Sequence, residues 1–182
     1  MNLTVHAGKI YRIGGRTPHN NKGQPADSHS IAGCARFDPA TKSWEELPPL
    51  PEPRSSHDVV VIDNQLIVVG GWALDGKSKS KWAETLAVMD FSVTPLGWRS
   101  AKQPFQRRAF MAASHDGKMY VIGGINESEK IVRDVSITIP GSMRGVTVRR
   151  CRREGACVRA GGRGAYGPLV CECFRWHAAS AE

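Results

Sequence analysis

The sequence predicts an all-β repeat protein made of short antiparallel strands, and three observations support this fold class. A unit of turn, strand and two glycines occurs three times, with its first glycine at positions 14, 70 and 123, so the period is 56 and then 53 residues. Periods of this length are typical of architectures in which each repeat is one supersecondary unit. The 182 residues also include 19 glycines and 11 prolines, which favour many short elements over long helices. A hydrophobic content of 41% is sufficient for one core.

The first repeat is expected to form four strands joined by three turns. A hairpin turn is expected at Gly8, because glycine adopts the positive φ that tight turns require. Gly14 and Gly15 end the second strand, and the polar segment 16–30 is expected to be a long exposed loop. The third strand stops at Asp38, which precedes a proline that cannot donate to a ladder. The expected strands cover residues 3–6, 10–13, 31–37 and 44–47.

The second repeat runs through the same steps, whereas the third stops early. Strands are expected at 57–62, 66–69, 86–91 and around Trp98, with a long loop at 72–82. In the third repeat the expected strands cover 110–115, the segment up to Gly123 and Gly124, and 134–139, with a loop at 125–132. The total is eleven strands. Residues 59–62 and 66–69 are apolar throughout, which predicts strands buried on both faces between neighbouring sheets.

The C-terminal segment 141–182 differs in composition from the repeats. It has eight arginines, three glutamates and no lysine or aspartate, and so carries +5 of the net charge of +8. Only residues 146–148 form a strand-like run, so we predict a disordered or aberrant tail, as expected for a foreign reading frame or an alternative exon. Because the basic excess lies in the tail, it does not predict that the repeats bind nucleic acid. Four cysteines lie in the tail without the paired spacing of zinc sites.

Four features recur in the same order along residues 1 to about 140. Two glycines follow a strand, an aspartate ends the next strand, a tryptophan follows, and a proline-containing linker reaches Arg54 or Arg107. This arrangement resembles the kelch repeat. The resemblance implies a partial kelch-type β-propeller of four-stranded antiparallel blades, with blade one at 1–54, blade two at 55–107 and an incomplete blade three at 108–140. The expected structural motif consists of Gly14, Gly15, Trp44, Gly70, Gly71, Trp98, Gly123 and Gly124.

Eleven strands make about two and three-quarter blades, whereas propellers close with about four to eight. The chain is therefore expected to be a fragment of a longer propeller, a truncated product with an aberrant tail, or a protomer that completes its ring with other chains. Two open blade faces would expose apolar surface, so self-association through these faces is a further expectation.

Antiparallel geometry places the loop after the second strand of each blade at the same end of the sheet as the linkers between blades. In kelch propellers that recognise proteins, arginines and serines at such positions line the partner pocket, where a guanidinium suits a carboxylate. The resemblance therefore implies a site for a protein or peptide. The alternative is that Arg54 and Arg107 cap strand ends or pair with acids of an adjacent blade. The predicted partner-binding residues are Arg16, Arg54, Ser55, Ser56, Trp72, Arg107 and Arg108.

A second candidate patch combines basic and aromatic side chains in the loop 72–82. Lys77, Lys79 and Lys81 lie between Trp72 and Trp82, an arrangement that suits an anionic ligand. Alternation of lysine and serine is more typical of a solvated loop.

The histidines do not indicate a metal site. His6, His57 and His115 lie in strands or at strand ends without metal-ligand spacing and are expected to be structural. His19 and His29 are ten residues apart in a segment expected to be flexible, which does not favour zinc. The sequence therefore predicts no metal and no cofactor.

No catalytic constellation is present, so the sequence favours a noncatalytic scaffold over an enzyme. Some kelch propellers are copper-dependent oxidases that use Tyr, Cys and His ligands, but Tyr11, Tyr120 and Cys34 do not form an obvious set. The favoured function is a kelch-repeat scaffold that recognises a protein or peptide partner through its linkers and the loops after the diglycines. The alternatives are a carbohydrate-acting propeller similar to sialic-acid mutarotases, and a truncated or frame-shifted fragment without independent function.

The hydropathy of the chain gives an expectation about its location. No run of 18 apolar residues occurs, and residues 1–8 contain neither a basic n-region nor an apolar h-region. A cytoplasmic protein that does not contact membranes is therefore expected.

Overall fold

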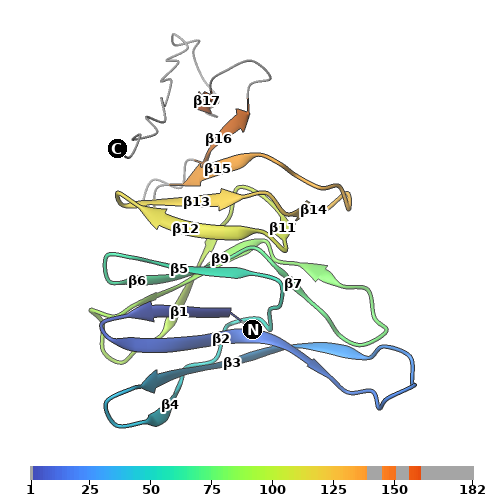
Figure 1. Cartoon of the computed structure of the whole chain (residues 1–182), viewed down its shortest axis with the longest axis vertical. Coiled ribbons are helices and arrows are strands. Elements are labelled where there is room, and N and C mark those ends of the chain that lie inside the picture. The colour runs from blue at the N-terminus through green and yellow to red at the C-terminus, as the bar shows by residue number, and fades with distance from the viewer. Residues whose placement is uncertain (1, 139–144, 151–155, 161–182) are drawn as a thin grey trace, which may run out of the picture.

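The computed structural model describes residues 2–138, 145–150 and 156–160. Three antiparallel sheets follow one another along this part of the chain and stack on one another (Figure 1). All of its regular elements are β-strands, so the predicted all-β class and the four-stranded antiparallel sheets are confirmed. The described residues contain no helix with the length and hydrophobicity that crossing a membrane requires.

Each sheet is formed by strands that are close in sequence. The first sheet has the order β1 (Asn2–His6), β2 (Lys9–Pro18), β3 (Ser28–Asp38) and β4 (Ser43–Leu47). The second has the order β5 (Asp58–Ile62), β6 (Gln65–Val69), β9 (Thr85–Asp90) and β10 (Trp98–Lys102). The third has the order β12 (Met111–His115), β13 (Lys118–Ile122), β15 (Val135–Thr138), β16 (Gly145–Arg150) and β17 (Ala156–Ala160). Two short pairs join β7 (Trp72–Ala73) to β8 (Lys81–Trp82) and β11 (Arg107–Arg108) to β14 (Ile125–Asn126).

The third sheet has more strands than the sequence pattern indicated. We expected three strands in this repeat, but β16 pairs with β15, with Val146 opposite Ile137, and β17 pairs with β16. Strand pairing uses backbone groups, so a segment can join a sheet edge without a clear alternating pattern of side chains. The rest of the predicted disordered tail lies outside the described residues.

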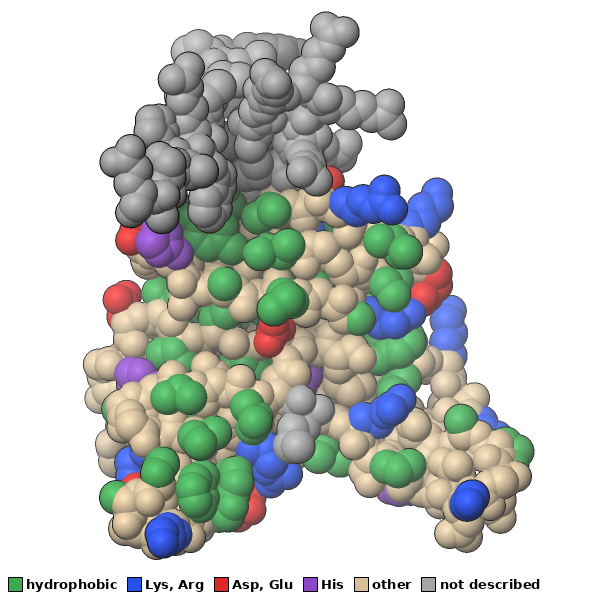
Figure 2. Space-filling view, viewed as in Figure 1, with side chains coloured by type: hydrophobic (Ala, Val, Ile, Leu, Met, Phe, Trp, Pro, Cys, Tyr) green, Lys and Arg blue, Asp and Glu red, His purple; other side chains and the backbone are tan. Residues whose placement is uncertain are grey.

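The pairing of β2 with β3 continues beyond the diglycine and forms an arm. A register shift between Ile13 and Gly15 is followed by further pairs, from Arg16 with Ser30 to Pro18 with Ser28. The predicted long loop at 16–30 was therefore wrong at both ends, because polar residues can pair through their backbone without an apolar face. The arm extends sideways from the first sheet in Figure 1 and forms a projection in Figure 2.

The hairpin turns have the backbone conformation that the sequence predicted. Ala7, Asp63 and Asp116 occupy the first turn position between the first two strands of each sheet, with φ values of 47°, 53° and 47°. Gly8 and Gly117 follow with φ of 74° and 66°. In the first and third turns, consecutive residues at positive φ give a turn whose twist matches that of the two strands. In the second turn only Asp63 has a positive φ.

The second sheet is buried on both faces, as its apolar strands predicted. One cluster lies between the first and second sheets and contains Tyr11, Ile13, Cys34, Leu47, Leu50, Val59, Leu66, Val68, Ala87 and Met89. The other lies between the second and third sheets and contains Val60, Ile62, Ile67, Val69, Val88, Phe110, Met119 and Val121. Adjacent residues of β5 and β6 thus face opposite neighbours, which is the consequence of two-residue periodicity in a strand.

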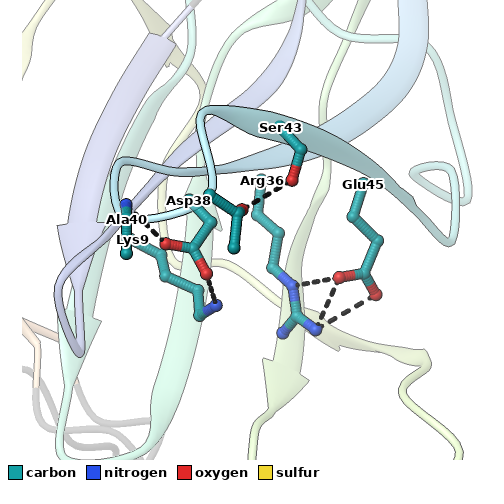
Figure 3. Close-up of polar contacts among 7 residues, drawn as sticks. Lys9, Arg36, Asp38, Ala40, Ser43 and Glu45 are labelled. Atoms are coloured by element: carbon teal, nitrogen blue, oxygen red, sulfur yellow. Dashed lines mark hydrogen bonds and ion pairs between the residues drawn. The ribbon is translucent and has the colours of Figure 1, made fainter.

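The aspartate that ends the third strand has the same role in two sheets. Asp38 accepts hydrogen bonds from Lys9 Nζ at 2.6 Å and from the Ala40 N–H at 2.9 Å (Figure 3). The Lys9 hydrogen bond is the main cause that lowers the pKa of Asp38. Asp90 accepts from Gln65 and from the Ser92 N–H in the same way. Each aspartate therefore closes its own turn and fastens it to the start of the second strand.

The two motif tryptophans have different surroundings. Trp98 packs against the cluster between the first and second sheets, and its indole N–H donates to the Pro48 carbonyl at 2.7 Å. Trp44 pairs with Phe37, and Phe37 pairs with Ile10 on its other side. These three side chains form a row on the face of the first sheet that points away from the second sheet. Trp44 is 54% exposed. A tryptophan at this position therefore packs against the preceding sheet where one exists.

The outer faces of the first and third sheets carry exposed apolar side chains. On the first sheet Leu3 and Val5 are 58% and 66% exposed, and on the third Met111 and Ile122 are 72% and 48% exposed. Self-association through these faces stays a prediction.

Candidate functional site

The linkers between sheets lie against the diglycines at one end of the stack. The Gly15 N–H donates to the Arg54 carbonyl at 2.9 Å, and the Gly71 N–H donates to the Arg107 carbonyl at 2.7 Å. The spacing of these two contacts follows the repeat, so each linker is held by the diglycine of the sheet that it leaves.

Four glycines of the three diglycines, Gly14, Gly70, Gly71 and Gly124, leave no room for a side chain. A Cβ on Gly71 would be 2.6 Å from the Ser55 carbonyl oxygen, and one on Gly124 would be 2.8 Å from that of Arg108. Gly70 and Gly14 are equally crowded by the linkers on the other side. All of these glycines have positive φ, and so does Gly123. The diglycine is therefore the point at which two linkers and one strand end approach closely.

Two of the predicted partner-binding arginines are buried. Arg54 is 3% exposed and donates from Nη1 to the Thr85 carbonyl of β9 at 2.8 Å. Arg107 is 7% exposed, with its guanidinium carbon 5.3 Å from the centre of the Phe105 ring. Burial lowers the pKa of both side chains. The contact of Arg54 with a strand end of the second sheet matches the structural alternative for this residue, and neither guanidinium is available at the surface.

The predicted serines are fixed by the backbone around them. Ser55 is buried, exchanges two backbone hydrogen bonds with Trp72 at 2.9 and 3.0 Å, and accepts a hydrogen bond at its Oγ from Ser30 Oγ at 2.9 Å. Ser56 is exposed with φ of 53°, and its carbonyl accepts from the Ala109 N–H. Arg16 is also exposed, on the arm opposite Ser30. Of these residues, Ser56 and Arg16 offer side chains to solvent.

Arg108 is the centre of a cluster that the structure assembles from three segments. Its guanidinium carbon is 4.0 Å from the centre of the Trp72 ring and 5.8 Å from that of Trp82. The two rings are paired across β7 and β8, with centres 5.7 Å apart. Nη2 of Arg108 forms an ion pair with Glu129, whose side chain is 58% exposed. We call Trp72, Trp82, Arg108 and Glu129 the Trp–Arg cluster.

The Trp–Arg cluster is rich in donors that lack acceptors. Within the part of the chain that the structure describes, Trp72 Nε1 and Arg108 Nε are buried without a hydrogen-bond partner. A groove of about 150 Å³ is lined by Glu52, Pro53, Arg54, Ala73, Lys81 and Ala83. Ala73 and Lys81 pair directly after Trp72 and Trp82, so this groove is on the other face of the β7–β8 pair from the two rings.

Sequence reasoning found some members of this cluster and missed others. Trp72 and Arg108 were predicted for partner binding, and Trp82 entered only through the lysine patch. Glu129 was missed, because nothing in its neighbourhood in the sequence links it to Arg108. Of the lysines, Lys77 and Lys79 are exposed and Lys81 makes an exposed ion pair with Glu52 at 3.6 Å, as in a solvated loop.

The other side chains singled out in the sequence have mainly packing roles. His57 is buried, its Nε2 is 3.2 Å from the Ile13 carbonyl oxygen, and burial lowers its pKa to about 4. His6 stacks on Phe91 with ring centres 4.7 Å apart. Burial raises the pKa of the Cys34 thiol.

The residues considered as oxidase ligands do not meet at one point. Tyr11 and Cys34 are buried between the first and second sheets, whereas Tyr120 is on β13 of the third sheet. No copper-like ligand set is therefore assembled from them.

Comparison with known proteins relates the chain to kelch proteins. It is 33% identical to Kelch-like protein 40a of Danio rerio over 132 residues, which is 72% of this chain and 20% of that protein. It is 30% identical to Kelch-like protein 41 of Homo sapiens over 137 residues, or 74% of this chain and 21% of that protein. The Danio rerio Kelch repeat and BTB domain-containing protein 12 is 26% identical over 151 residues, or 74% of this chain and 24% of that protein. The chain therefore spans about a fifth to a quarter of these relatives.

Among solved structures, the chain superposes on YjhT with a TM-score of 0.64 at 15% identity, covering 88% of this chain and 54% of that one. Identity at this level shows the shared fold alone. No protein-family model matches the chain. The repeated diglycines, the four-stranded sheets and the similarity to kelch proteins lead to one conclusion: the chain belongs to the kelch-repeat β-propeller family.

Proposed function

We propose that the chain is a protein-interaction scaffold whose Trp–Arg cluster binds a peptide segment through an acidic side chain. The observation that carries this proposal is the stacking of Arg108 on Trp72, beside a second tryptophan, at the end of the stack where the linkers and diglycine loops meet. The kelch relatives support an interaction scaffold in general. Their partners do not transfer to a chain that spans so little of their length.

The residue types of the cluster suit protein recognition. Tryptophan and arginine dominate the binding energy of protein interfaces, because they bury a large area and also provide donors. Stacking holds the Arg108 guanidinium in place, so little side-chain freedom is lost when a ligand binds. Arginine also offers donors in a planar fork, which matches a carboxylate.

Glu129 occupies the position that a ligand carboxylate would take. Its side chain is 58% exposed, whereas that of Arg108 is 17% exposed, so the acid is the partner that can move away. An exposed ion pair of this kind contributes about 0–1 kcal/mol, and exchange for a ligand carboxylate is therefore not costly.

The groove on the other face of the β7–β8 pair matches a peptide side chain better than a whole sugar. Its volume is about 150 Å³, whereas small-molecule sites usually have about 300–1,000 Å³. Its walls combine apolar Pro53 and Ala83 with charged Glu52 and Lys81.

The proposal is tested with a displayed library of random peptides selected on the full chain, followed by fluorescence anisotropy of the selected peptides. We expect enrichment of aspartate and glutamate. Arg108→Ala should weaken binding about 10- to 100-fold, the loss expected for a central arginine. Glu129→Gln should strengthen it, because the competing carboxylate charge is removed.

The first sheet supplies a matched control pair. Arg36 and Glu45 form an exposed ion pair of the same kind at 2.8 Å (Figure 3). Arg36→Ala and Glu45→Gln should leave peptide binding unchanged. The proposal is contradicted if Arg108→Ala leaves the peptide affinity unchanged. It is also contradicted if substitutions in the Arg36–Glu45 pair change the affinity as much as those in the Arg108–Glu129 pair. Sialic-acid mutarotation by the same preparation, followed by NMR, would support the carbohydrate alternative instead.

A further inference from the structure

The arm of the first sheet crosses a loop of the second sheet and is tied to it through the backbone. The Ser30 N–H donates to the Leu74 carbonyl at 2.9 Å, and the Gly76 N–H donates to the Ser28 carbonyl at 3.0 Å. Between these bonds, His29 forms an isolated bridge with Asp75. Residues more than 40 positions apart in the sequence are thus held face to face, and ionisable side chains from the arm gather at this crossing.

We propose that His19, Asp27 and His29 bind a divalent transition metal ion, with zinc as the best match. Their donor atoms all lie within 4.8 Å of one another. Nε2 of His29 is 2.9 Å from Oδ1 of Asp27. In a tetrahedral site with bonds of about 2.0–2.1 Å the ligand atoms are about 3.3 Å apart, so small side-chain rotations bring the three donors to an ion.

Asp75 orients the central ligand. Its Oδ1 is 3.2 Å from Nδ1 of His29, on the side of the ring opposite Asp27. A proton on Nδ1 that is donated to a carboxylate leaves Nε2 with a free lone pair directed at the ion. Metal-binding histidines usually have such a carboxylate partner, which fixes the tautomer and raises the basicity of the ligand.

The loop around the three donors is held in shape by its own hydrogen bonds. The His19 N–H donates to the Asp27 carbonyl at 2.7 Å, and the Asp27 N–H donates to Oδ1 of Asn20 at 3.2 Å. The donors are therefore close together before any ion binds, although eight positions separate His19 from Asp27 in the sequence. Preorganisation of this kind raises metal affinity, since less chain entropy is lost on binding.

Gly76 keeps the space beside the donors open. Its φ is 59°, and a Cβ there would be 2.6 Å from Oδ1 of Asp27 and 3.1 Å from Nε2 of His29. Any other residue would press on two of the three donor atoms. The second sheet thus contributes both a ligand-orienting carboxylate and the clearance that the donors need.

The donor set selects among metal ions. Two imidazoles and one carboxylate suit zinc and other first-row transition metals, whereas calcium and magnesium prefer oxygen ligands alone. The rings of His19 and His29 stack with centres 4.2 Å apart at 21°. His19 is exposed, so its ring is able to turn towards the ion.

Zinc binding by the full chain, with thiol ligands removed, tests the proposal. The background variant carries serine at the four cysteines of the C-terminal segment, because thiolates bind zinc strongly: Cys151, Cys157, Cys171 and Cys173. Competition with a chromogenic chelator should give one zinc ion per chain, and zinc should raise the melting temperature. Calcium or magnesium at the same concentration should not raise it.

Substitutions assign the ligands. His19→Ala and His29→Ala should each weaken zinc binding at least 10-fold, and Asp75→Asn should weaken it about 10- to 100-fold by releasing the His29 ring. His115→Ala is the matched control, because His115 also pairs with a carboxylate, Asp116, at 3.2 Å and is 75% exposed. It should bind zinc as the background does.

The proposal is overturned if His19→Ala binds zinc as tightly as the background, or if His115→Ala causes an equal loss. His19 lies in an exposed turn, so its substitution decides the outcome even if His29→Ala fails to fold by circular dichroism. Cobalt gives a second readout: the background should show the visible absorption of four-coordinate cobalt, and His19→Ala should lose it.

Discussion

Substitution of Gly70 by alanine is the most direct test of how the diglycine supports the stack. Gly70 has φ of 62°, and a Cβ there would be 2.5 Å from Cζ of Phe110 and 2.6 Å from the Arg107 carbonyl oxygen. Phe110 belongs to the core cluster between the second and third sheets. The Arg107 carbonyl accepts the Gly71 N–H. The added methyl group therefore strikes a packed ring and a hydrogen-bonded backbone, neither of which yields easily.

The magnitude has two contributions. The left-handed conformation costs alanine about 1–2 kcal/mol relative to glycine. Overpacking of a well-packed site costs about 1–3 kcal/mol more. A total loss of about 3 kcal/mol in the free energy of unfolding lowers the melting temperature of a domain of this size by roughly 6–12 °C.

Gly117→Ala separates the two contributions. Gly117 has a similar φ of 66°, but a Cβ there would meet no atom within 4 Å. Its substitution should cost the conformational contribution alone, about 1–2 kcal/mol. The measurement is urea unfolding of the full chain, followed by tryptophan fluorescence. If Gly70→Ala destabilises the chain no more than Gly117→Ala does, the close approach of linker and diglycine is not what requires glycine there.

Three further predictions concern the contacts between sheets. Trp98→Ala should lower the free energy of unfolding by about 3 kcal/mol, because it opens a cavity between the first two sheets and leaves the Pro48 carbonyl without its donor. Trp44 is exposed, so Trp44→Ala should lower it by under about 1 kcal/mol in the same unfolding assay. Arg54→Ala should cost about 1–3 kcal/mol by leaving the Thr85 carbonyl without its donor, and Arg16→Ala should be neutral in thermal melts. The pKa of His57 is lowered to about 4 in the folded chain, so between pH 6.5 and 4 the unfolded chain binds a proton at this residue and the folded chain does not. The free energy of unfolding should therefore fall by up to about 3 kcal/mol as the pH falls through this range. His57→Phe introduces the residue that the third repeat has at Phe110, and it should remove this part of the pH dependence of the urea midpoint.

Much of the repeat could be predicted from short-range pattern. The hairpin turns, the apolar strands of the second sheet and the diglycines depend on residues within about ten positions of one another. Turn chemistry and two-residue periodicity are local properties, so they are visible in the sequence. The arm was missed because its pairing, such as Pro18 with Ser28, rests on backbone hydrogen bonds between polar residues.

The candidate site could be predicted only in part, and the linker arginines show why. Arg54, Arg107 and Arg108 all lie in linkers beside a diglycine, and the sequence offers no reason to separate them. The structure buries Arg54 under β9 and stacks Arg108 on Trp72. Which of them faces solvent depends on the neighbouring sheet.

The proposed metal ligands His19, Asp27 and His29 show the same limit at longer range. A spacing of ten residues between His19 and His29 gave no indication of zinc, yet the turn of the arm stacks their rings. Asp75, which orients His29, comes from another repeat. The turn of the arm therefore brings the three donors together, and a contact with the second sheet orients one of them.

The sequence by itself determined the all-β class, the repeat and its family, because these are recorded in local periodicity and in the spacing of glycines and tryptophans. Only the tertiary structure decided which side chains are buried and which meet. Burial and the meeting of donor atoms depend on how one sheet stacks on the next, and so on residues 30 to 60 positions away, which local pattern does not encode.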